Sequence, residues 1–150
     1  MYGLLPGRPR AAYARSVTSV EDIAPARYLS LTTFRRDGTG VATPVWFAED
    51  GGRLYVWTNA DSWKVKRLRR DQRVTVAVCD ARGRIADGAL RAEGTAELLD
   101  REGTVRARDL VARKYGWQFR AVDWPARIVR RGKRPHAGIA VTLGEPPATA

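Results

Sequence analysis

The sequence contains few of the side chains that build metal centres and covalent catalytic sites. It has one cysteine, Cys79, which is expected to be buried in an apolar strand, and one histidine, His136, which is expected in an exposed basic loop. A lone cysteine excludes a disulfide within the chain, and a zinc site needs several cysteine and histidine ligands. The sequence therefore predicts no metal, and no Ser-His-Asp or Cys-His set stands out as a candidate for nucleophilic catalysis.

Long apolar segments and glycine-rich phosphate motifs are missing as well. No apolar run approaches the roughly 20 residues that a membrane-spanning helix needs. The N-terminal residues lack the apolar core of a signal peptide, so we expect a cytoplasmic protein without a membrane partner. Neither the GxGxxG nor the P-loop pattern occurs. If the chain is an enzyme, we expect a bound cofactor to carry its chemistry.

Positive charge, in contrast, is abundant. The chain has 27 Lys and Arg residues against 16 Asp and Glu residues, which gives a net charge of +11. Such a balance favours an anionic partner, which can be nucleic acid, a membrane surface, or a small molecule with phosphate or carboxylate groups. The length of 150 residues suits one domain. We expect an N-terminal arm with the start of the first helix (1–25), a barrel domain (26–144) and a tail (145–150).

Short apolar alternations separated by turn residues predict a mainly β protein. About six strands joined by hairpins are expected, over residues 28–34, 41–48, 54–58, 73–80, 90–98 and 138–143. Helices are expected over residues 62–70 and 101–115, with a short one near Val20. Pro44 lies inside the second strand and cannot donate a ladder hydrogen bond, so this strand should lie at a sheet edge or carry a bulge.

Residues 54–70 combine a strand, a turn and a strongly basic helix. Asp61 or Ser62 can cap this helix, and the free N–H groups at a helix N-terminus favour anions. The Ser62 hydroxyl and the Lys64 ammonium then form a candidate phosphate cradle. The same residues also fit a solvated basic helix that follows a strand, so the pattern by itself leaves both interpretations open.

Four segments, taken in order, resemble a known family. They are YLSLTTFRRDGTGVATPVWF (28–47), GGRLYVWTNADSWKVKRLRRDQRVTVAV (51–78), LRAEGTAELL (90–99) and ARKYG (112–116). They resemble the pyridoxamine 5′-phosphate oxidase-like split β-barrel proteins, and within that group the coenzyme F420-dependent reductases of actinobacteria. The most specific piece is the pattern Thr-x-x-x-Ser-x-Lys-x-Lys-x-Leu from Thr58 to Leu68.

The resemblance implies an α+β fold that is mainly β, a six-stranded antiparallel split β-barrel of the FMN/F420-binding type with two or three flanking helices. It also implies a homodimer with cofactor sites at the subunit interface. The implied cofactor-binding residues are Thr43, Pro44, Val45, Trp46, Thr58, Asn59, Ser62, Trp63, Lys64, Lys66 and Arg67. The cofactor phosphate would contact Ser62 and Lys64, with help from Lys66 or Arg67, and the ring would lie along residues 43–46.

The expected cofactor is coenzyme F420, which would deliver hydride to a small hydrophobic acceptor. This deazaflavin carries a phosphodiester and a polyglutamate tail, so it is a longer anion than FMN and suits a diffuse cationic track. Arg67, Arg69 and Arg70 can supply such a track, and residues 127–134 of a neighbouring chain can reach it. The catalytic residues and the physiological acceptor stay unassigned.

Three alternatives stay open. The same fold with FMN would be a flavin oxidase or reductase, and a protein that carries or sequesters the cofactor would need no catalytic residue. A basic barrel can also bind nucleic acid, with tryptophans stacked on bases. Trp46 and Trp57 lie in apolar strands and are expected in the core, which makes nucleic acid the less favoured partner.

Overall fold

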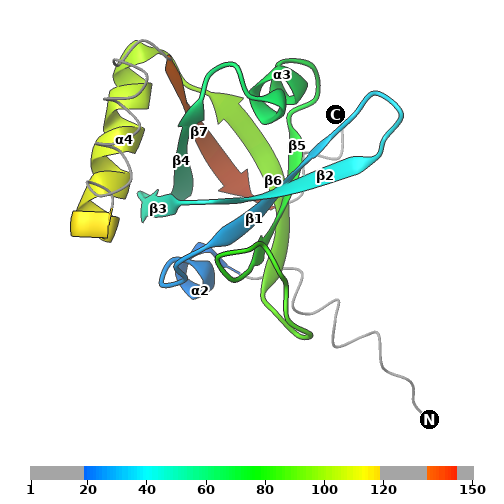
Figure 1. Cartoon of the computed structure of the whole chain (residues 1–150), viewed down its shortest axis with the longest axis horizontal. Coiled ribbons are helices and arrows are strands. Elements are labelled where there is room, and N and C mark those ends of the chain that lie inside the picture. The colour runs from blue at the N-terminus through cyan, green and yellow to red at the C-terminus, as the bar shows by residue number, and fades with distance from the viewer. Residues whose placement is uncertain (1–18, 119–134, 145–150) are drawn as a thin grey trace.

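The computed structural model describes residues 19–118 and 135–144, which form one curled antiparallel sheet with helices around it (Figure 1). The strands are β1 (Leu29–Phe34), β2 (Gly40–Val45), β3 (Phe47–Asp50), β4 (Arg53–Asn59), β5 (Arg73–Val78), β6 (Arg91–Leu98) and β7 (His136–Leu143). The mainly β architecture with helices is confirmed. The expected number of six strands is wrong, because these residues form a sheet of seven.

The extra strand comes from a break at Trp46. The predicted strand over residues 41–48 is divided into β2 and β3, which are separated in the chain by Trp46 alone. The order of strands in the sheet is β2-β1-β5-β6-β7-β4-β3, so these two neighbours in sequence stand at opposite ends of the sheet. Because the chain passes directly from one end to the other, the sheet has to curl until its ends approach each other. Pro44 lies in an end strand, as its missing N–H predicts.

The inner face of the curled sheet carries the main core. Alternation along each strand sends one set of side chains inward, and the largest fully buried ones are Phe47, Ile23, Leu29, Leu31, Leu54, Leu68 and Ile139. Gly94 lies in β6, where it pairs with Val74 of β5 and with Leu143 of β7. A Cβ atom at Gly94 would lie 2.3 Å from the carbonyl oxygen of Thr142, so only glycine allows β6 and β7 to approach this closely.

Helix α4 (Arg101–Tyr115) covers the outer side of β3, β4 and β7 (Figure 1). The Asp100 carboxylate accepts a hydrogen bond of 2.8 Å from the backbone N–H of Gly103, and Gly116 ends the helix with a φ of 60°. The buried face of α4 carries Ala107, Val111 and Tyr115. These bounds are the ones that the sequence predicts for residues 101–115.

Two shorter helices complete the described fold. Helix α2 (Val20–Ile23) buries Ile23 and follows Ser19, whose backbone N–H donates to the Asp22 carboxylate. Helix α3 (Trp63–Arg70) joins β4 to β5 and contacts β1 and β6. It buries Val65 and Leu68 and keeps its cationic residues outside the core, so the basic helix expected over residues 62–70 is confirmed.

Three expected environments differ from the structure. His136 lies in strand β7 rather than in a surface loop, and its ring stacks on Trp57 with 4.0 Å between the ring centroids. Trp46 and Trp57 are half-buried outside the barrel core, where α4 covers them, because the inner face is filled by aliphatic side chains. Cys79 follows the end of β5 and is only half-buried.

Other sequence-based expectations lie outside the described residues. They concern the arm over residues 1–18, the basic segment 127–134 and the tail 145–150. None of the helices among residues 19–118 and 135–144 combines the length and the apolar character needed to cross a membrane.

Candidate functional site

The chain enters helix α3 in a conformation that leaves the Ser62 hydroxyl without a partner. The backbone N–H of Ser62 donates to the carbonyl oxygen of Asn59 over 3.2 Å, and Ser62 stands at the N-cap position with extended backbone angles. An N-cap serine normally accepts a hydrogen bond from the first turn. Here the side chain makes no such bond, and its Oγ is buried without a hydrogen-bond partner in the described part of the chain. This hydroxyl can therefore serve a bound group.

A second hydroxyl in the same condition lies on β2. Thr43 pairs with Leu31 in the ladder, and its Oγ1 is buried with no hydrogen-bond partner among the described residues. Since side chains alternate along a strand, Leu31 shares its face with Thr33, one step nearer to the β1–β2 turn. Leaving a buried polar group unsatisfied costs about 1–3 kcal/mol. These two hydroxyls, one at the start of α3 and one on β2, are therefore candidates for hydrogen bonds to a polar ligand.

Lys64 is the second residue of α3, and its side chain is half-buried. The Lys64 ammonium donates a hydrogen bond of 3.3 Å to the hydroxyl of Thr58, at the end of β4. No ion pair joins Lys64 to a carboxylate within residues 19–118 and 135–144. Burial, and to a smaller extent the nearby Arg67 guanidinium, lower the pKa of Lys64. A half-buried cation without a counterion is placed to take an anion from solution.

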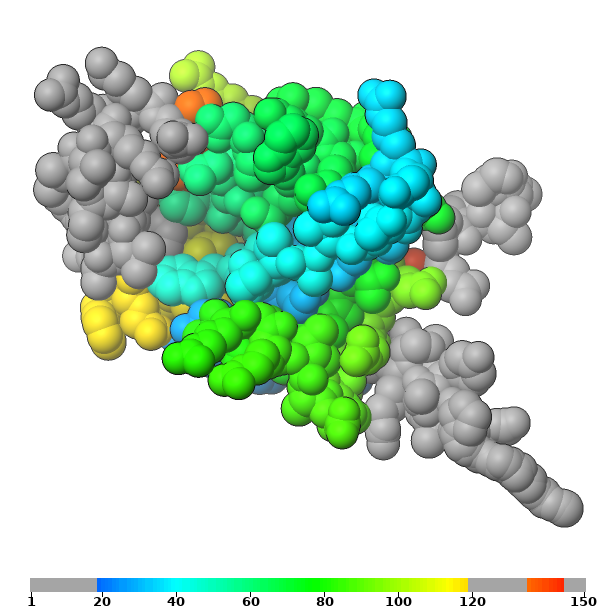
Figure 2. Space-filling view, turned by 45° about the vertical axis from the view of Figure 1, so that its right-hand side comes forward, coloured from blue at the N-terminus to red at the C-terminus, as the bar shows by residue number. Residues whose placement is uncertain are grey.

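The outer side of α3 forms a hollow that is lined almost entirely by cations. It has a volume of about 370 Å³, and its lining residues are Arg35, Arg36, Trp63, Lys66, Arg67 and Arg70. We call it the cationic hollow. In the space-filling view the cyan surface of the β1–β2 hairpin lies beside the green surface that includes α3 (Figure 2). The exposed Trp63 ring is covered by the Lys66 ammonium at 4.4 Å from its centroid.

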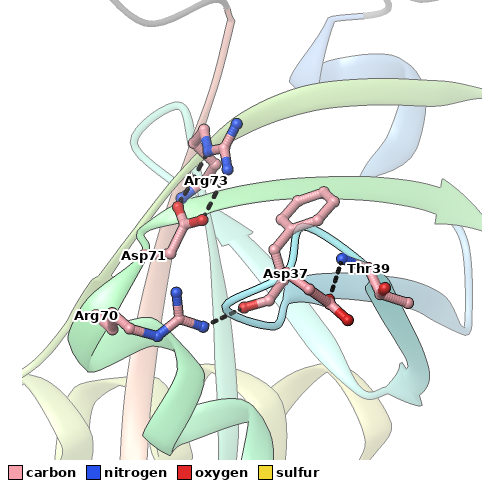
Figure 3. A network of polar contacts seen from close by, with 6 residues as sticks. Asp37, Thr39, Arg70, Asp71 and Arg73 are labelled. Carbon is pink, nitrogen blue, oxygen red and sulfur yellow. Dashed lines mark hydrogen bonds and ion pairs between the residues drawn. The ribbon is translucent and has the colours of Figure 1, made fainter.

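No acidic side chain lines the cationic hollow, and the two nearest acids in sequence are engaged elsewhere (Figure 3). Asp37 accepts from the backbone N–H of Thr39 over 2.9 Å, and Asp71 pairs with Arg73 over 2.8 Å. Arg70 donates to the carbonyl oxygen of Phe34 over 2.7 Å, which fixes its guanidinium beside the hairpin. The positive charge of the hollow is therefore not neutralised by these neighbours.

The residues expected along the cofactor ring do not present one continuous side-chain surface. Val45 is 8% exposed and belongs to the core, while the Trp46 ring stacks on Tyr115 at 4.4 Å, on the α4 side. Pro44 faces outward, and a Cβ atom at Gly83 would lie 3.4 Å from its ring. What residues 43–45 share is the outer edge of an end strand, where backbone groups have no neighbouring strand in the described sheet.

The structure thus gathers a subset of the expected residues around the start of α3. Thr58 and Lys64 are hydrogen-bonded, Asn59 and Ser62 form the preceding turn, and the hollow adds side chains from α3. Sequence reasoning missed three participants: Thr33, Arg35 and Arg36. The available signal for Thr33 was a polar residue at a position where the alternation of β1 demands a core residue.

A known protein family matches most of the chain. Residues 18–143 match the family model described as pyridoxamine 5′-phosphate oxidase, so the chain belongs to this family of split-barrel proteins. A comparison with curated protein sequences gave no match.

Solved structures show the same fold. The conserved hypothetical protein Rv2991 from Mycobacterium tuberculosis is 26% identical, with a TM-score of 0.63 over 88% of this chain and 84% of that one. A FAD-binding protein from Mesorhizobium loti is 18% identical, with a TM-score of 0.58 over 90% and 88%. An F420 reductase is 20% identical, with a TM-score of 0.51 over 83% and 93%.

Proposed function

We propose that the chain is a deazaflavin-dependent oxidoreductase that uses coenzyme F420 to reduce a small hydrophobic acceptor. The observation that carries this proposal is the cationic hollow beside the Ser62–Lys64 cradle. The phosphate of FMN would occupy the cradle and leave the hollow empty. F420 continues beyond its phosphodiester into a chain of carboxylates, for which the four cations of the hollow other than Arg67, namely Arg35, Arg36, Lys66 and Arg70, are a suitable surface.

The residues of this chain would bind and orient the cofactor. The Lys64 ammonium and the Ser62 hydroxyl would hold the phosphate, and Arg67 would add a second charge. The Thr43 hydroxyl and the edge of β2 offer hydrogen-bonding groups to the ring. The bound reduced deazaflavin would supply a hydride, and the proton that completes the reduction would come from solvent.

Two tyrosines that are candidate acids both lie on the α4 side of the sheet. Tyr115 donates its proton to the carbonyl oxygen of Arg27 over 2.8 Å and accepts from the N–H of Phe47. Tyr55 is 6% exposed and accepts from Arg53. Both tyrosines have structural partners, so the proposal assigns neither of them a catalytic role.

The proposed protein is a homodimer with its cofactor sites at the subunit interface. Support comes from apolar side chains exposed on and after α4: Val105 is 53% exposed and Trp117 is 76% exposed. Such a surface is suitable for burial by a second copy of the chain. Light scattering at micromolar concentration should return the mass of a dimer, and the mass of a monomer would contradict this part of the proposal.

The cofactor is tested by separate titrations of the protein with oxidised F420 and with FMN, at low and at moderate salt. We expect tighter binding of F420, with a preference over FMN that decreases as salt screens the charges of the hollow. Tighter binding of FMN under both conditions would overturn the choice of cofactor.

Catalysis is tested by the oxidation of reduced F420 with a panel of quinone and nitroaromatic acceptors. Tight binding without turnover of any acceptor would favour a cofactor carrier.

FMN is the second candidate, and one observation favours it. The Ser62 hydroxyl, the half-buried Lys64 ammonium and the Thr43 hydroxyl are few in number, which matches a phosphate monoester attached to a ring rather than a longer anion. The fold likeness to a FAD-binding protein adds support for a flavin. In that case the protein would be a flavin oxidase or reductase with the same cradle.

A further inference from the structure

Thr33 is a buried polar residue that contacts the site through one hydrogen bond. Its side chain is 0% exposed and lies on the core-facing side of β1, in line with Leu29 and Leu31. Its Oγ1 accepts a hydrogen bond of 3.3 Å from Nη1 of Arg67. A hydroxyl is an unfavourable choice for a core position unless it is hydrogen-bonded. The position therefore needs an explanation beyond packing.

Arg67 stands between two regions of positive charge. It lines the cationic hollow, and its charge also acts on the Lys64 ammonium, whose pKa it lowers. Nothing in the described part of the chain pairs Arg67 with a carboxylate. A long, flexible arginine with two cationic neighbours, Lys64 and Arg70, would turn toward water if no acceptor held it.

The end of β1 supplies such acceptors to two arginines in succession. Thr33 holds Arg67 through its hydroxyl, and Phe34 holds Arg70 through its carbonyl oxygen over 2.7 Å. Arg67 and Arg70 are three residues apart, so they lie on neighbouring positions of one helix face. The hydroxyl of Thr33 is the part of this arrangement that a single substitution can remove without disturbing the backbone.

We propose that Thr33 is a positioning residue that determines specificity for phosphorylated cofactors, because it holds the Arg67 guanidinium beside Lys64 so that two cations meet the first phosphate. This inference rests on the proposed function, since it assumes that the phosphate of a flavin or deazaflavin lies in the cradle. Without the Thr33 hydroxyl, Arg67 would turn away from Lys64 toward solvent, and the phosphate would keep Lys64 alone. Binding of the ring itself would be unaffected.

Three variants separate this role from a structural one. Thr33→Val keeps the shape of the side chain in the core and removes the acceptor. Thr33→Ser keeps the acceptor and removes a buried methyl group. Thr32→Val is the matched control, because Thr32 is the preceding residue of the same strand on the opposite, partly exposed face.

The experiment compares dissociation constants for phosphorylated and phosphate-free ligands: FMN against riboflavin, and F420 against the phosphate-free deazaflavin. In Thr33→Val, the affinity for the phosphorylated ligand should fall about tenfold, because a hydrogen bond that positions a charged group is lost. The affinity for the phosphate-free ligand should not change. Thr33→Ser and Thr32→Val should keep the wild-type ratio. The free protein should melt at or above the wild-type temperature in Thr33→Val and below it in Thr33→Ser.

A structural role would give the opposite order, with binding that follows stability. Equal losses for both ligands in Thr33→Val, or no loss at all, would overturn the inference. If the wild-type protein binds none of the four ligands, the proposed function fails, and inorganic phosphate becomes the probe. Thermal stabilisation by phosphate that is lost in Thr33→Val and kept in Thr33→Ser would still support the role of Thr33, whereas equal stabilisation of all variants would refute it.

Discussion

The two longer helices border the same sheet in very different ways. On the α4 side, the Tyr115 hydroxyl donates to Arg27 and accepts from Phe47, and the Lys114 ammonium donates to the carbonyl oxygens of Ala24 and Ala26. At the start of α3, the buried Ser62 hydroxyl has no partner in the described part of the chain, and the same holds for the Thr43 hydroxyl on β2. Where hydrogen bonding is complete, the polar groups stabilise the fold. Where it is incomplete, polar groups remain that a ligand could pair with.

The charged residues of the two sides differ in the same way: ion pairs lie near α4, and a hollow lined by cations lies beside α3. Near α4, Arg106 pairs with Asp50, and Arg53 pairs with Glu97 over 3.2 Å. The cationic hollow beside α3 has no acidic residue in its lining. Basic residues in the last turn of α3 interact favourably with the negative end of the helix dipole. The dipole does not account for the arginines of the facing hairpin. The excess of charge on the α3 side is therefore better explained by an anionic ligand than by stability.

The largest effect on stability should come from removing the contacts of Tyr115 on the α4 side. Tyr115 is 4% exposed, stacks on Trp46 and makes two hydrogen bonds. Tyr115→Ala should lower the free energy of unfolding by about 3–5 kcal/mol, as removal of a buried aromatic ring does. Tyr115→Phe should lower it by about 1–3 kcal/mol, because it leaves buried groups unpaired. Urea denaturation measures both changes. A loss below about 1 kcal/mol for the alanine variant would show that the contacts of Tyr115 on the α4 side do not stabilise the fold.

The corresponding change on the α3 side should affect binding instead. A contact between an ammonium and a phosphate contributes about 1.5–3 kcal/mol, so Lys64→Ala should weaken cofactor binding by about tenfold or more. The melting temperature of the free protein should hardly change, since the half-buried ammonium of Lys64 has no counterion among the described residues.

Lys66→Ala is the matched control for Lys64. Lys66 is exposed and lies over the Trp63 ring, and an exposed charge contributes about 0–1 kcal/mol. Its loss should weaken binding less than the loss of Lys64. An unaltered affinity in a folded Lys64→Ala protein would show that the cradle is misassigned.

A pH titration sharpens the contrast through Lys114. Burial, with a smaller contribution from Arg27, lowers the pKa of Lys114 to about 8, below its ordinary value of 10.5. Below pH 8 the folded and unfolded chains both hold this proton, so the full penalty of burying the charge is present. Between these two values the unfolded chain holds more protons, and the contribution of Lys114 to the free energy of unfolding rises with pH.

The measurement compares wild-type protein with Lys114→Met at neutral and at alkaline pH. The lost hydrogen bonds to Ala24 and Ala26 lower the stability of the variant at both values, so they cancel in the difference. The stability of the wild type relative to the variant should increase from neutral to alkaline pH. A decrease would mean that the hydrogen-bonded ammonium is favoured over the neutral amine.

The smallest effects should come from the rim of the cationic hollow. Arg35 and Arg36 line it from the hairpin side, and exposed pairs contribute about 0–1 kcal/mol each. Arg35→Ala and Arg36→Ala should each weaken F420 binding by less than about fivefold and should not change FMN binding. The effects should disappear at moderate salt. An equal loss for FMN would show that the hollow does not distinguish the two cofactors.

The sequence predicted the elements whose signals are local. Asp100 and Gly116 fix the ends of α4 through hydrogen bonds and backbone angles of their own neighbourhood. Pro44 predicted an edge strand because it lacks a donor, and this holds for β2. The sequence also showed Ser62 near the start of a basic helix, which is where the structure places it. In each case the decisive interactions join residues close together in the chain.

The sequence by itself thus determined the positions of most strands and helices, since period and capping depend on near neighbours. Tertiary structure alone decided the break at Trp46, because it depends on which strands stand at the two ends of the sheet. It also decided that Thr33 meets Arg67 across 34 residues of chain, and that the Ser62 hydroxyl stays unpaired. Pairing and burial of polar groups depend on segments that only folding brings together. The sequence could therefore indicate which segment carries the candidate site, but not which side chains contact one another there.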